Sequence, residues 1–295
     1  MTSEIANYLQ TQSLIIENEL QRLIPNYKEP QEALFEAARY ALLGGGKRLR
    51  PILTLATTRT LQGNIHAALT PACTLELIHT YSLIHDDLPC MDDDDYRRGK
   101  LSLHRKYSEG LAVLTGDYLL TYAFEVLSQS PYLNPEKKLQ LISVLSMRSG
   151  SEGMIGGQVM DIGCDGEAVS LETLKLLHQK KTGALIAAAM EFGGILSDAT
   201  AEQMKALKHF GEAIGLAFQV VDDILDVISS EAKRGKGTAS DIRNHKFTYV
   251  SLLGIEQAQA YASRCYDEAI KALSHLPCNT SLLAELAQFI IKRKY

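Results

Sequence analysis

Tryptophan is absent from the chain, and cysteine is scarce. The five cysteines are odd in number, widely spaced and never arranged as CxxC, so the sequence indicates neither a disulfide framework nor a zinc knuckle. Such thiols fit a reducing compartment, and we expect a cytoplasmic protein. The N-terminus lacks the basic and apolar regions of a signal peptide, and the most apolar run, residues 182–196, is interrupted by Glu191. Because that run is too short for a bilayer, neither export nor a membrane span is expected.

A surplus of basic residues is also missing. Thirty Lys and Arg residues against 35 Asp and Glu residues give a net charge of -5. This balance argues against a nucleic-acid partner, because such binding depends on neutralising phosphates. The apolar fraction of 46% is ordinary for a globular protein, and 295 residues can bury a large core without disulfides. Any anion site must therefore be local.

Sustained two-residue alternation of apolar residues is the third absence. Apolar residues instead recur at steps of three and four, which predicts an all-α fold. Helix starts are predicted where a capping residue precedes proline or stands three positions before glutamine: Thr70 with Pro71, Asn134 with Pro135, and Thr200 with Gln203. No long linker or composition break divides the chain, so residues 1–295 are predicted to form a single large helical bundle.

Two acidic clusters stand out. The first, LIHDDLPCMDDDDYRRG at residues 83–99, is either a solvated acidic turn or a cation site, and an EF-hand is excluded because position twelve from Asp86 is Arg97. In the second, FQVVDDILDV at residues 218–227, Gln219, Asp222 and Asp226 share one helical face. Carboxylates in an apolar helix need a partner. Oxygen-only ligands favour Mg²⁺, which could bridge them to a diphosphate.

Basic residues that suit a phosphate occur in three places. Residues 44–51 read GGGKRLRP, a glycine-rich turn that fits neither a Walker loop nor GxGxxG. Lys181 and Thr182 follow Lys180 inside an apolar helix, and Lys236 and Lys246 follow the second acidic cluster. Each group alone could be merely solvated.

The histidines near the first acidic cluster differ in their expected roles. His79 lies two helical turns before Asp86 on the same face, and it is either a phosphate donor or a satisfied core histidine. His85 lies off that face, and we expect it to be structural.

Taken together, these motifs resemble the trans-isoprenyl diphosphate synthases, closely the bacterial farnesyl and geranylgeranyl diphosphate synthases, from about residue 30 onward. DDxxxxD corresponds to Asp86, Asp87 and Asp92, and DDxxD to Asp222, Asp223 and Asp226. GGKRLRP spans residues 45–51, KTG residues 181–183 and FQxxDD residues 218–223. The resemblance implies an isoprenoid synthase-like bundle around a central cavity, acting as a homodimer.

The resemblance also implies residue roles. Isopentenyl diphosphate would be held by Lys47, Arg50, His79 and Arg98. The allylic diphosphate would be held by Arg97, Lys181, Thr182, Gln219, Lys236 and Lys246. Magnesium would bind Asp86, Asp92 and Asp222, and the residues most directly tied to catalysis would be Lys181, Asp86 and Asp222.

The implied reaction is a head-to-tail condensation. The allylic diphosphate ionises, the isopentenyl double bond attacks the resulting carbocation, and a proton is lost. Tyr81, about 7.5 Å along the helix from Asp86, resembles the aromatic residue of farnesyl-length enzymes. Ser82 beside it leaves room for a geranylgeranyl product, so that alternative stays open. A non-catalytic regulatory homologue and a terpene cyclase are less well supported, because both aspartate motifs and the basic turn are intact.

Overall fold

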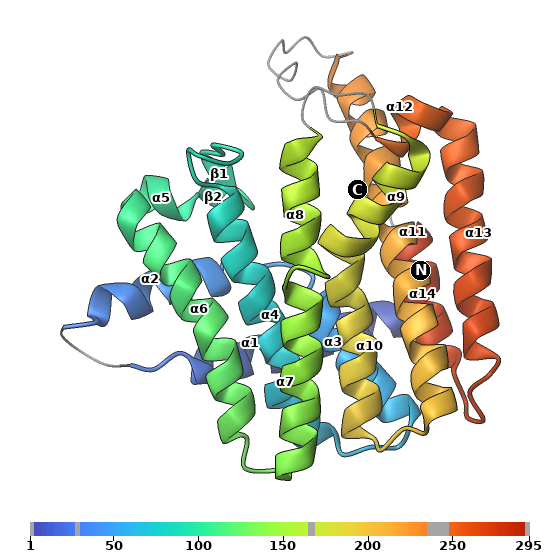
Figure 1. Cartoon of the computed structure of the whole chain (residues 1–295), viewed down its shortest axis with the longest axis horizontal. Helices are drawn as coiled ribbons and strands as arrows, with labels where there is room; N and C mark the ends of the chain where they lie inside the picture. Colours follow the sequence, from blue (N-terminus) through green and yellow to red (C-terminus); the bar gives the residue numbers. More distant parts are fainter. Residues whose placement is uncertain (1–2, 27–29, 165–168, 235–247, 293–295) are drawn as a thin grey trace. The chain divides into compact units, whose positions relative to one another are not determined.

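The computed structural model describes residues 3–26, 30–164, 169–234 and 248–292. These residues are almost wholly helical, which confirms the predicted all-α class (Figure 1). The chain forms two compact units. The N-terminal unit comprises residues 2–143 with 195–197, and the C-terminal unit comprises residues 144–194 and 198–295. The single domain expected over residues 1–295 stays a prediction.

The N-terminal unit begins with four helices and continues through a hairpin into three more. Its elements are α1 (Ser3–Leu23), α2 (Glu32–Leu42), α3 (Leu49–Thr60), α4 (Ile65–Asp86), β1 (Tyr96–Arg97), β2 (Lys100–Leu101), α5 (Leu103–Lys106), α6 (Glu109–Gln129) and the first part of α7 (Pro135–Ser149). β1 and β2 pair antiparallel, with Tyr96 opposite Leu101. α4 packs against α3 and α6.

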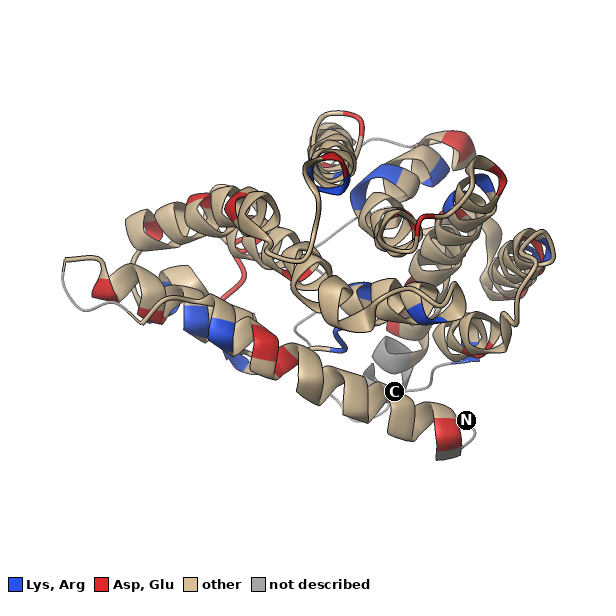
Figure 2. Ribbon diagram, turned by 90° about the horizontal axis from the view of Figure 1, so that it is seen from below, with Lys and Arg blue, Asp and Glu red and all other residues tan. Residues whose placement is uncertain are grey.

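The C-terminal unit is built around one long helix. Its elements after α7 are α8 (Met154–Gly163), α9 (Leu171–His178), the π-helical turn η1 (Gln179–Gly183), α10 (Ala184–Leu196), α11 (Ala201–Arg234), α12 (Tyr249–Leu253), α13 (Ile255–Leu273) and α14 (Ser281–Lys292). α11 packs along α13 and also contacts η1, α12 and α14. Charged positions are interspersed along the helices (Figure 2).

Two of the predicted helix starts are confirmed. α7 begins at Pro135, and the Oδ1 atom of Asn134 accepts the Lys137 N–H across 2.8 Å. α11 begins after a reciprocal capping box, in which the Thr200 N–H donates to Gln203 and the Gln203 N–H donates back to Thr200. Side-chain capping of the first-turn N–H groups thus sets both boundaries, as expected from sequence.

The helix start predicted at Thr70 and Pro71 is wrong. α4 begins earlier, at Ile65, where the Asn64 side chain accepts the Ala67 N–H, and Pro71 lies inside the helix. The Thr70 hydroxyl donates to Glu19 on α1 instead of capping a helix. The Thr70 side chain, which the sequence pattern predicts as a helix cap, therefore bonds to a residue of another helix instead.

A buried arginine organises the entry to α3 in the N-terminal unit. Arg48 adopts a left-handed backbone conformation with φ of 48°. Its guanidinium donates to Glu76 on α4 across 3.2 Å and to the Leu42 carbonyl across 2.7 Å. Glu17 lies 3.4 Å from the same group. These bonds fix the glycine-rich turn between α2 and α3, because they tie both of its ends to the core.

The core of the C-terminal unit contains α10, whose residues 184–190 are nearly fully buried. Glu191, which interrupts this apolar run, is also buried and accepts a hydrogen bond from Arg148 across 2.7 Å. Arg148 also lies 3.5 Å from Glu212 on α11. The charge that the apolar helix carries is therefore neutralised inside the unit.

Among the described residues, α6 is the one helix long and apolar enough to cross a membrane by length and composition. Core helices pass the same test, so this is weak evidence. α6 packs against α2, α4 and α5, and 39% of its most apolar window is buried. Val113 and Leu114 are exposed on it. The expected absence of a membrane span stays a prediction.

Arg48 provides a test of the N-terminal core. Arg48→Ala leaves the Glu76 carboxylate buried without its cation, and we expect the free energy of unfolding to fall by about 3–5 kcal/mol. Replacing both partners, as Arg48→Met with Glu76→Leu, should cost far less because no unpaired charge remains. Urea denaturation measures the stability of both variants. An Arg48→Ala variant as stable as the wild type would contradict the role of Arg48 as the partner of the buried Glu76.

Candidate functional site

The first aspartate-rich segment closes into a loop directly after α4. The Asp92 N–H donates to the Asp86 carbonyl across 2.9 Å. This bond brings together the two positions of the loop that the sequence predicts as metal ligands. Asp86 is half-buried and Asp92 is exposed, so neither side chain is sequestered in the core.

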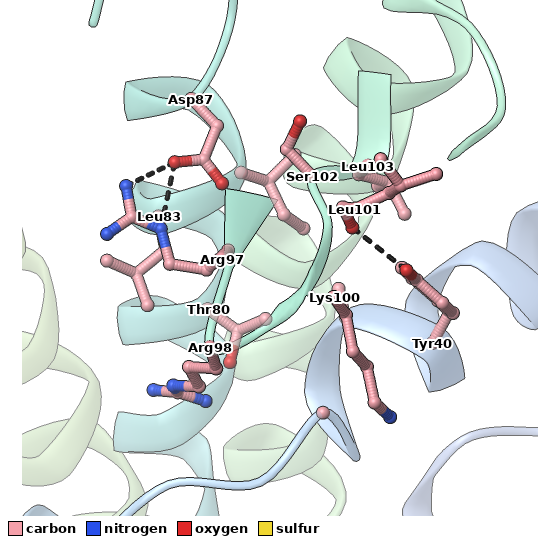
Figure 3. Close-up of a pocket in the computed structure, with 13 residues that line it drawn as sticks. Tyr40, Thr80, Leu83, Asp87, Arg97, Arg98, Lys100, Leu101, Ser102 and Leu103 are labelled. Atoms are coloured by element: carbon pink, nitrogen blue, oxygen red, sulfur yellow. Dashed lines mark hydrogen bonds and ion pairs between the residues drawn. The ribbon is translucent and has the colours of Figure 1, made fainter. Parts of the chain in front are cut away.

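Asp87, between these two positions, has a different environment. It is only 3% exposed, and its Oδ1 atom accepts hydrogen bonds from both Nε, at 2.9 Å, and Nη2 of Arg97 (Figure 3). Arg97 Nη2 also donates to Asp94 across 3.0 Å. Both partners line a small cavity of about 40 Å³. Asp87 therefore fixes the position of Arg97, which the family resemblance assigns to the allylic diphosphate.

The glycine-rich turn receives Arg98 from the hairpin. Gly46 has a φ of 137°, and a Cβ atom there would lie 2.9 Å from the Arg98 guanidinium carbon. Arg98 Nη1 donates to the Gly45 carbonyl. A residue with a side chain would be strained at position 46 because of its positive φ, and it would also shift the Arg98 guanidinium, so glycine suits this position.

Three of the residues predicted for isopentenyl diphosphate are brought together in the N-terminal unit. Burial and the positive charges of Arg50 and Arg98 hold the pKa of His79 well below its usual range. The Nε atom of Arg50 is buried and has no hydrogen-bond partner among the described residues. Lys47, the fourth predicted residue, is exposed on the neighbouring turn. The cluster thus combines two guanidinium groups with a neutral imidazole.

Tyr81 and Ser82, predicted to influence product length, lie on α4. Tyr81 is 5% exposed, packs edge-on against His85 and has a hydroxyl without a hydrogen-bond partner among the described residues. Burial raises the pKa of this phenol to about 12. The Ser82 hydroxyl donates to the His79 carbonyl, and His85 Nε2 lies 3.1 Å from the Val113 carbonyl on α6.

The second aspartate motif lies on α11, and its Asp223 and Asp226 line a cavity in the C-terminal unit. Gln219 and Asp222 are half-buried and Asp226 is exposed. The cavity has a volume of about 290 Å³, and its polar lining includes Asp161, Lys181, Thr182, Gln219, Asp223 and Asp226. Three residues predicted for the allylic diphosphate therefore share one cavity with the motif. Lys236 and Lys246, also predicted for it, lie outside the described residues.

The position of Lys181 is fixed by its own helical turn and by contacts with α8. It lies in the π-helical turn η1, an element common at functional sites. Its Nζ atom lies 2.6 Å from the Asp161 carboxylate on α8. Gly157 allows the backbones of α8 and η1 to approach closely, because a Cβ atom at position 157 would lie 2.3 Å from the backbone nitrogen of Lys181. The ammonium group is therefore positioned at the cavity before any ligand binds.

A chain of hydrogen bonds runs from η1 through α11 to α12. Thr182 donates to Gln219 Oε1 across 3.0 Å, and Gln219 Nε2 donates to Asp223 Oδ1 across 3.1 Å. Asp223 Oδ2 accepts the Tyr249 backbone N–H across 2.8 Å. Burial raises the pKa of Asp223 to about 6, although these two hydrogen bonds oppose the shift.

His178 completes the wall of this cavity. Its ring lies 5.4 Å from the Tyr249 ring, and burial lowers its pKa to about 4, against the opposing effect of Asp161. The imidazole is therefore neutral at physiological pH. Lys181 remains the cation that lines the described part of the cavity.

Three buried or paired carboxylates were not assigned roles from the sequence. Asp87 and Asp223 stand inside the recognised motifs, but their partners, Arg97 and Tyr249, come from segments that fold back later in the chain. Asp161 follows a glycine pair on α8, and its place one helical turn after Gly157 is the signal that could have indicated it.

Comparison with known proteins places these motifs in a family. The polyprenyl synthetase family model matches residues 31–278. The chain belongs to this family. A farnesyl diphosphate synthase of Micrococcus luteus is 45% identical over 271 residues, covering 92% of this chain and 93% of that protein. A chloroplastic geranylgeranyl pyrophosphate synthase of Capsicum annuum is also 45% identical, covering 90% of this chain and 73% of that protein.

Solved structures in the family confirm the expected fold. The crystal structure of an FPP/GFPP synthase from Zymomonas mobilis superposes with a TM-score of 0.88 at 37% identity, covering 99% of this chain and 100% of that one. A geranyltransferase from Helicobacter pylori superposes with a TM-score of 0.84 at 36% identity, covering 99% and 98%. The resemblance read from the motifs is therefore confirmed at the level of family and fold.

The carboxylates of both motifs fit the magnesium that the family resemblance implies. Asp86 and Asp92 are joined by the closed loop, and Asp222 and Asp226 stand one helical turn apart on α11. Oxygen ligands of this kind suit a hard divalent cation that keeps further positions for phosphate and water. No group of three or more metal-ligating side chains converges within the part of the chain that the structure describes. Magnesium binding stays a prediction.

Gly157 tests how tightly Lys181 is positioned. Gly157→Ala forces its new methyl group against the η1 backbone, and we expect overpacking to lower the free energy of unfolding by about 1–3 kcal/mol. Gly163→Ala is the matched control on the same helix, because nothing lies within 4 Å of its added Cβ atom. Urea denaturation of the two variants compares them directly, and equal stability would refute the close-approach argument.

Proposed function

We propose that this chain is a short-chain trans-prenyltransferase that condenses isopentenyl diphosphate with dimethylallyl and geranyl diphosphate to form farnesyl diphosphate. The observation that carries this proposal is the presence of two sets of basic and polar groups, each near an aspartate motif and each suited to bind an anion. Arg50, His79 and Arg98 form one set, and Lys181, Thr182 and Gln219 form the other. A reaction that joins two substrates, each carrying a diphosphate, needs two such sets.

The residues of this chain would act mainly by electrostatics. When the allylic C–O bond breaks, its electron pair leaves with the diphosphate, which gains negative charge. Arg97, Lys181 and Thr182 would stabilise this charge, and would therefore stabilise the transition state more strongly than the bound substrate. Bound magnesium, held by Asp86, Asp92 and Asp222, would add positive charge at the same leaving group. No protein nucleophile is required.

The second substrate is positioned by the basic cluster of the N-terminal unit. Arg50 and Arg98 supply charge to the isopentenyl diphosphate, and the exposed Lys47 can reach it from the turn. His79 is neutral near pH 7 because burial and the adjacent guanidinium groups lower its pKa, so it contributes a hydrogen bond rather than a charge. The isopentenyl double bond then attacks the allylic cation, and transfer of a proton to the released diphosphate completes the condensation.

Farnesyl-length product is favoured by the buried Tyr81, whose ring fills space about 7.5 Å along α4 from Asp86. A geranylgeranyl product is the second candidate, supported by the relative from Capsicum annuum and by the small Ser82 beside Tyr81. A regulatory, non-catalytic homologue is disfavoured because every aspartate of both motifs is present.

Assembly and location follow as parts of the same proposal. We expect a homodimer, and exposed apolar residues on α6 (Val113 and Leu114) and on α8 (Ile155, Val159 and Ile162) support it, since such positions are candidates for a subunit interface. All five cysteines are free thiols, which suits a cytoplasmic protein.

Product analysis tests the activity. Purified protein is incubated with magnesium, labelled isopentenyl diphosphate and either dimethylallyl, geranyl or farnesyl diphosphate. A C15 end product is expected from the first two allylic substrates, whereas a C20 product would identify the geranylgeranyl alternative. Asp86→Ala and Asp222→Ala should abolish turnover while the circular dichroism spectrum is unchanged. Absence of any product from the wild type would refute the proposed activity.

Tyr81 provides a separate test of product length. Tyr81→Ala removes the ring, and we expect products longer than C15 because the growing chain gains room. Tyr81→Phe is the matched control, since it keeps the ring and removes only the hydroxyl, and it should retain the wild-type product. Chromatography of the dephosphorylated alcohols distinguishes the two. A C15 limit in an active alanine variant would show that another residue stops elongation.

A further inference from the structure

Asp223 differs from the other two aspartates of its motif in burial. Its exposed fraction is 6%, whereas Asp222 is half-buried and Asp226 is exposed. Adjacent residues on a helix point about 100° apart, so Asp222 and Asp223 cannot face the same side. The motif therefore presents one carboxylate to the core and leaves the others nearer to the solvent.

Both oxygens of Asp223 already have donors. Oδ2 accepts the Tyr249 N–H across 2.8 Å, and Oδ1 accepts Gln219 Nε2 across 3.1 Å. Tyr249 is the first residue of α12, where the N–H has no partner within its own helix. Its ring is fully buried and lies 5.4 Å from both the His178 and the Tyr261 rings. Asp223 thus ties the start of α12 to α11.

The carboxylate also fixes the direction of the hydrogen bonds that follow. Because an ionised carboxylate only accepts, Gln219 must turn its NH₂ group toward Asp223. Its Oε1 atom is then left facing Thr182, whose hydroxyl donates to it across 3.0 Å. The orientation of Gln219 and Thr182 in the cavity lining therefore depends on the carboxylate of Asp223.

We propose that Asp223 is a positioning residue for the allylic diphosphate site rather than a metal ligand, acting by orienting Gln219 and Thr182 and by anchoring α12. This inference rests on the proposed function, because it takes Gln219 and Thr182 as diphosphate-binding groups. A cation at Asp223 would have to share a buried carboxylate with two N–H donors.

The Asp223→Asn variant separates the two roles of Asp223, the orientation of the Gln219 amide and the anchoring of α12. The asparagine Oδ1 atom can still accept the Tyr249 N–H, but its NH₂ group meets Gln219 Nε2 and reverses that amide. We expect the KM for geranyl diphosphate to rise about tenfold, the size expected for one mispaired buried group. The KM for isopentenyl diphosphate and the magnesium concentration for half-maximal activity should stay unchanged. Asp222→Asn, by contrast, should raise that magnesium concentration.

Asp223→Ala removes both functions, and its anchor can be followed without substrate. Hydrogen exchange of the Tyr249 amide, measured by NMR, should be about tenfold or more faster in Asp223→Ala than in the wild type. Asp223→Asn should exchange like the wild type. Equal Tyr249 exchange in Asp223→Ala and the wild type would overturn the anchor.

Two kinetic outcomes overturn the orienting role. A magnesium requirement raised in Asp223→Asn to the level of Asp222→Asn would make Asp223 a metal ligand. A wild-type KM for geranyl diphosphate in Asp223→Asn would show that the orientation of Gln219 is not needed. Failure of the proposed function is distinguishable, because an inactive wild type leaves the Tyr249 exchange comparison intact.

Discussion

Charge that leaves water has to be met inside the protein by opposite charge or by hydrogen-bond donors, and the local architecture of both units depends on this requirement. Arg48 meets Glu76 and thereby holds the glycine-rich turn. Asp87 meets Arg97 and holds the hairpin against α4. Asp223 meets the Tyr249 N–H and holds α12. In each case a buried charge fixes a segment that carries, or borders, groups suited to bind phosphate.

These anchors explain why neighbouring aspartates have different environments. Asp86 is half-buried and Asp87 buried at the end of α4, and the same contrast recurs between Asp222 and Asp223 on α11. A doublet on a helix necessarily points its members in different directions. One aspartate can therefore bind and hold a neighbouring segment while the other stays near the solvent. The repeated doublet places an anchored carboxylate directly beside one that stays nearer to the solvent.

The sequence predicted the parts of this arrangement that are local. The recurrence of apolar residues gives the helical class, and the Thr200 and Gln203 capping box gives the start of α11 because both partners lie within one turn. The shared face of Gln219, Asp222 and Asp226 follows from the helical repeat. Motif spacing likewise indicated the family and the two groups of basic residues.

What the sequence did not predict depends on partners distant in the chain. Thr70 resembles a helix cap but donates to Glu19 on another helix. The bond from Asp161 to Lys181 joins residues on separate elements, and Tyr249 lies 26 positions after Asp223. No local pattern specifies such pairs, because they exist only once the helices have packed.

The π-helical turn at residues 179–183 holds more residues than an α-helical turn of the same height. The buried faces of α9 and α10 are therefore out of phase by about 100°, the rotation contributed by one α-helical residue. Loss of one residue would merge them into a continuous α-helix and turn one of the two faces away from its core. Surface loops absorb insertions and deletions, but this internal stretch does not. The length of this stretch is therefore fixed by the packing of the two helices that it joins.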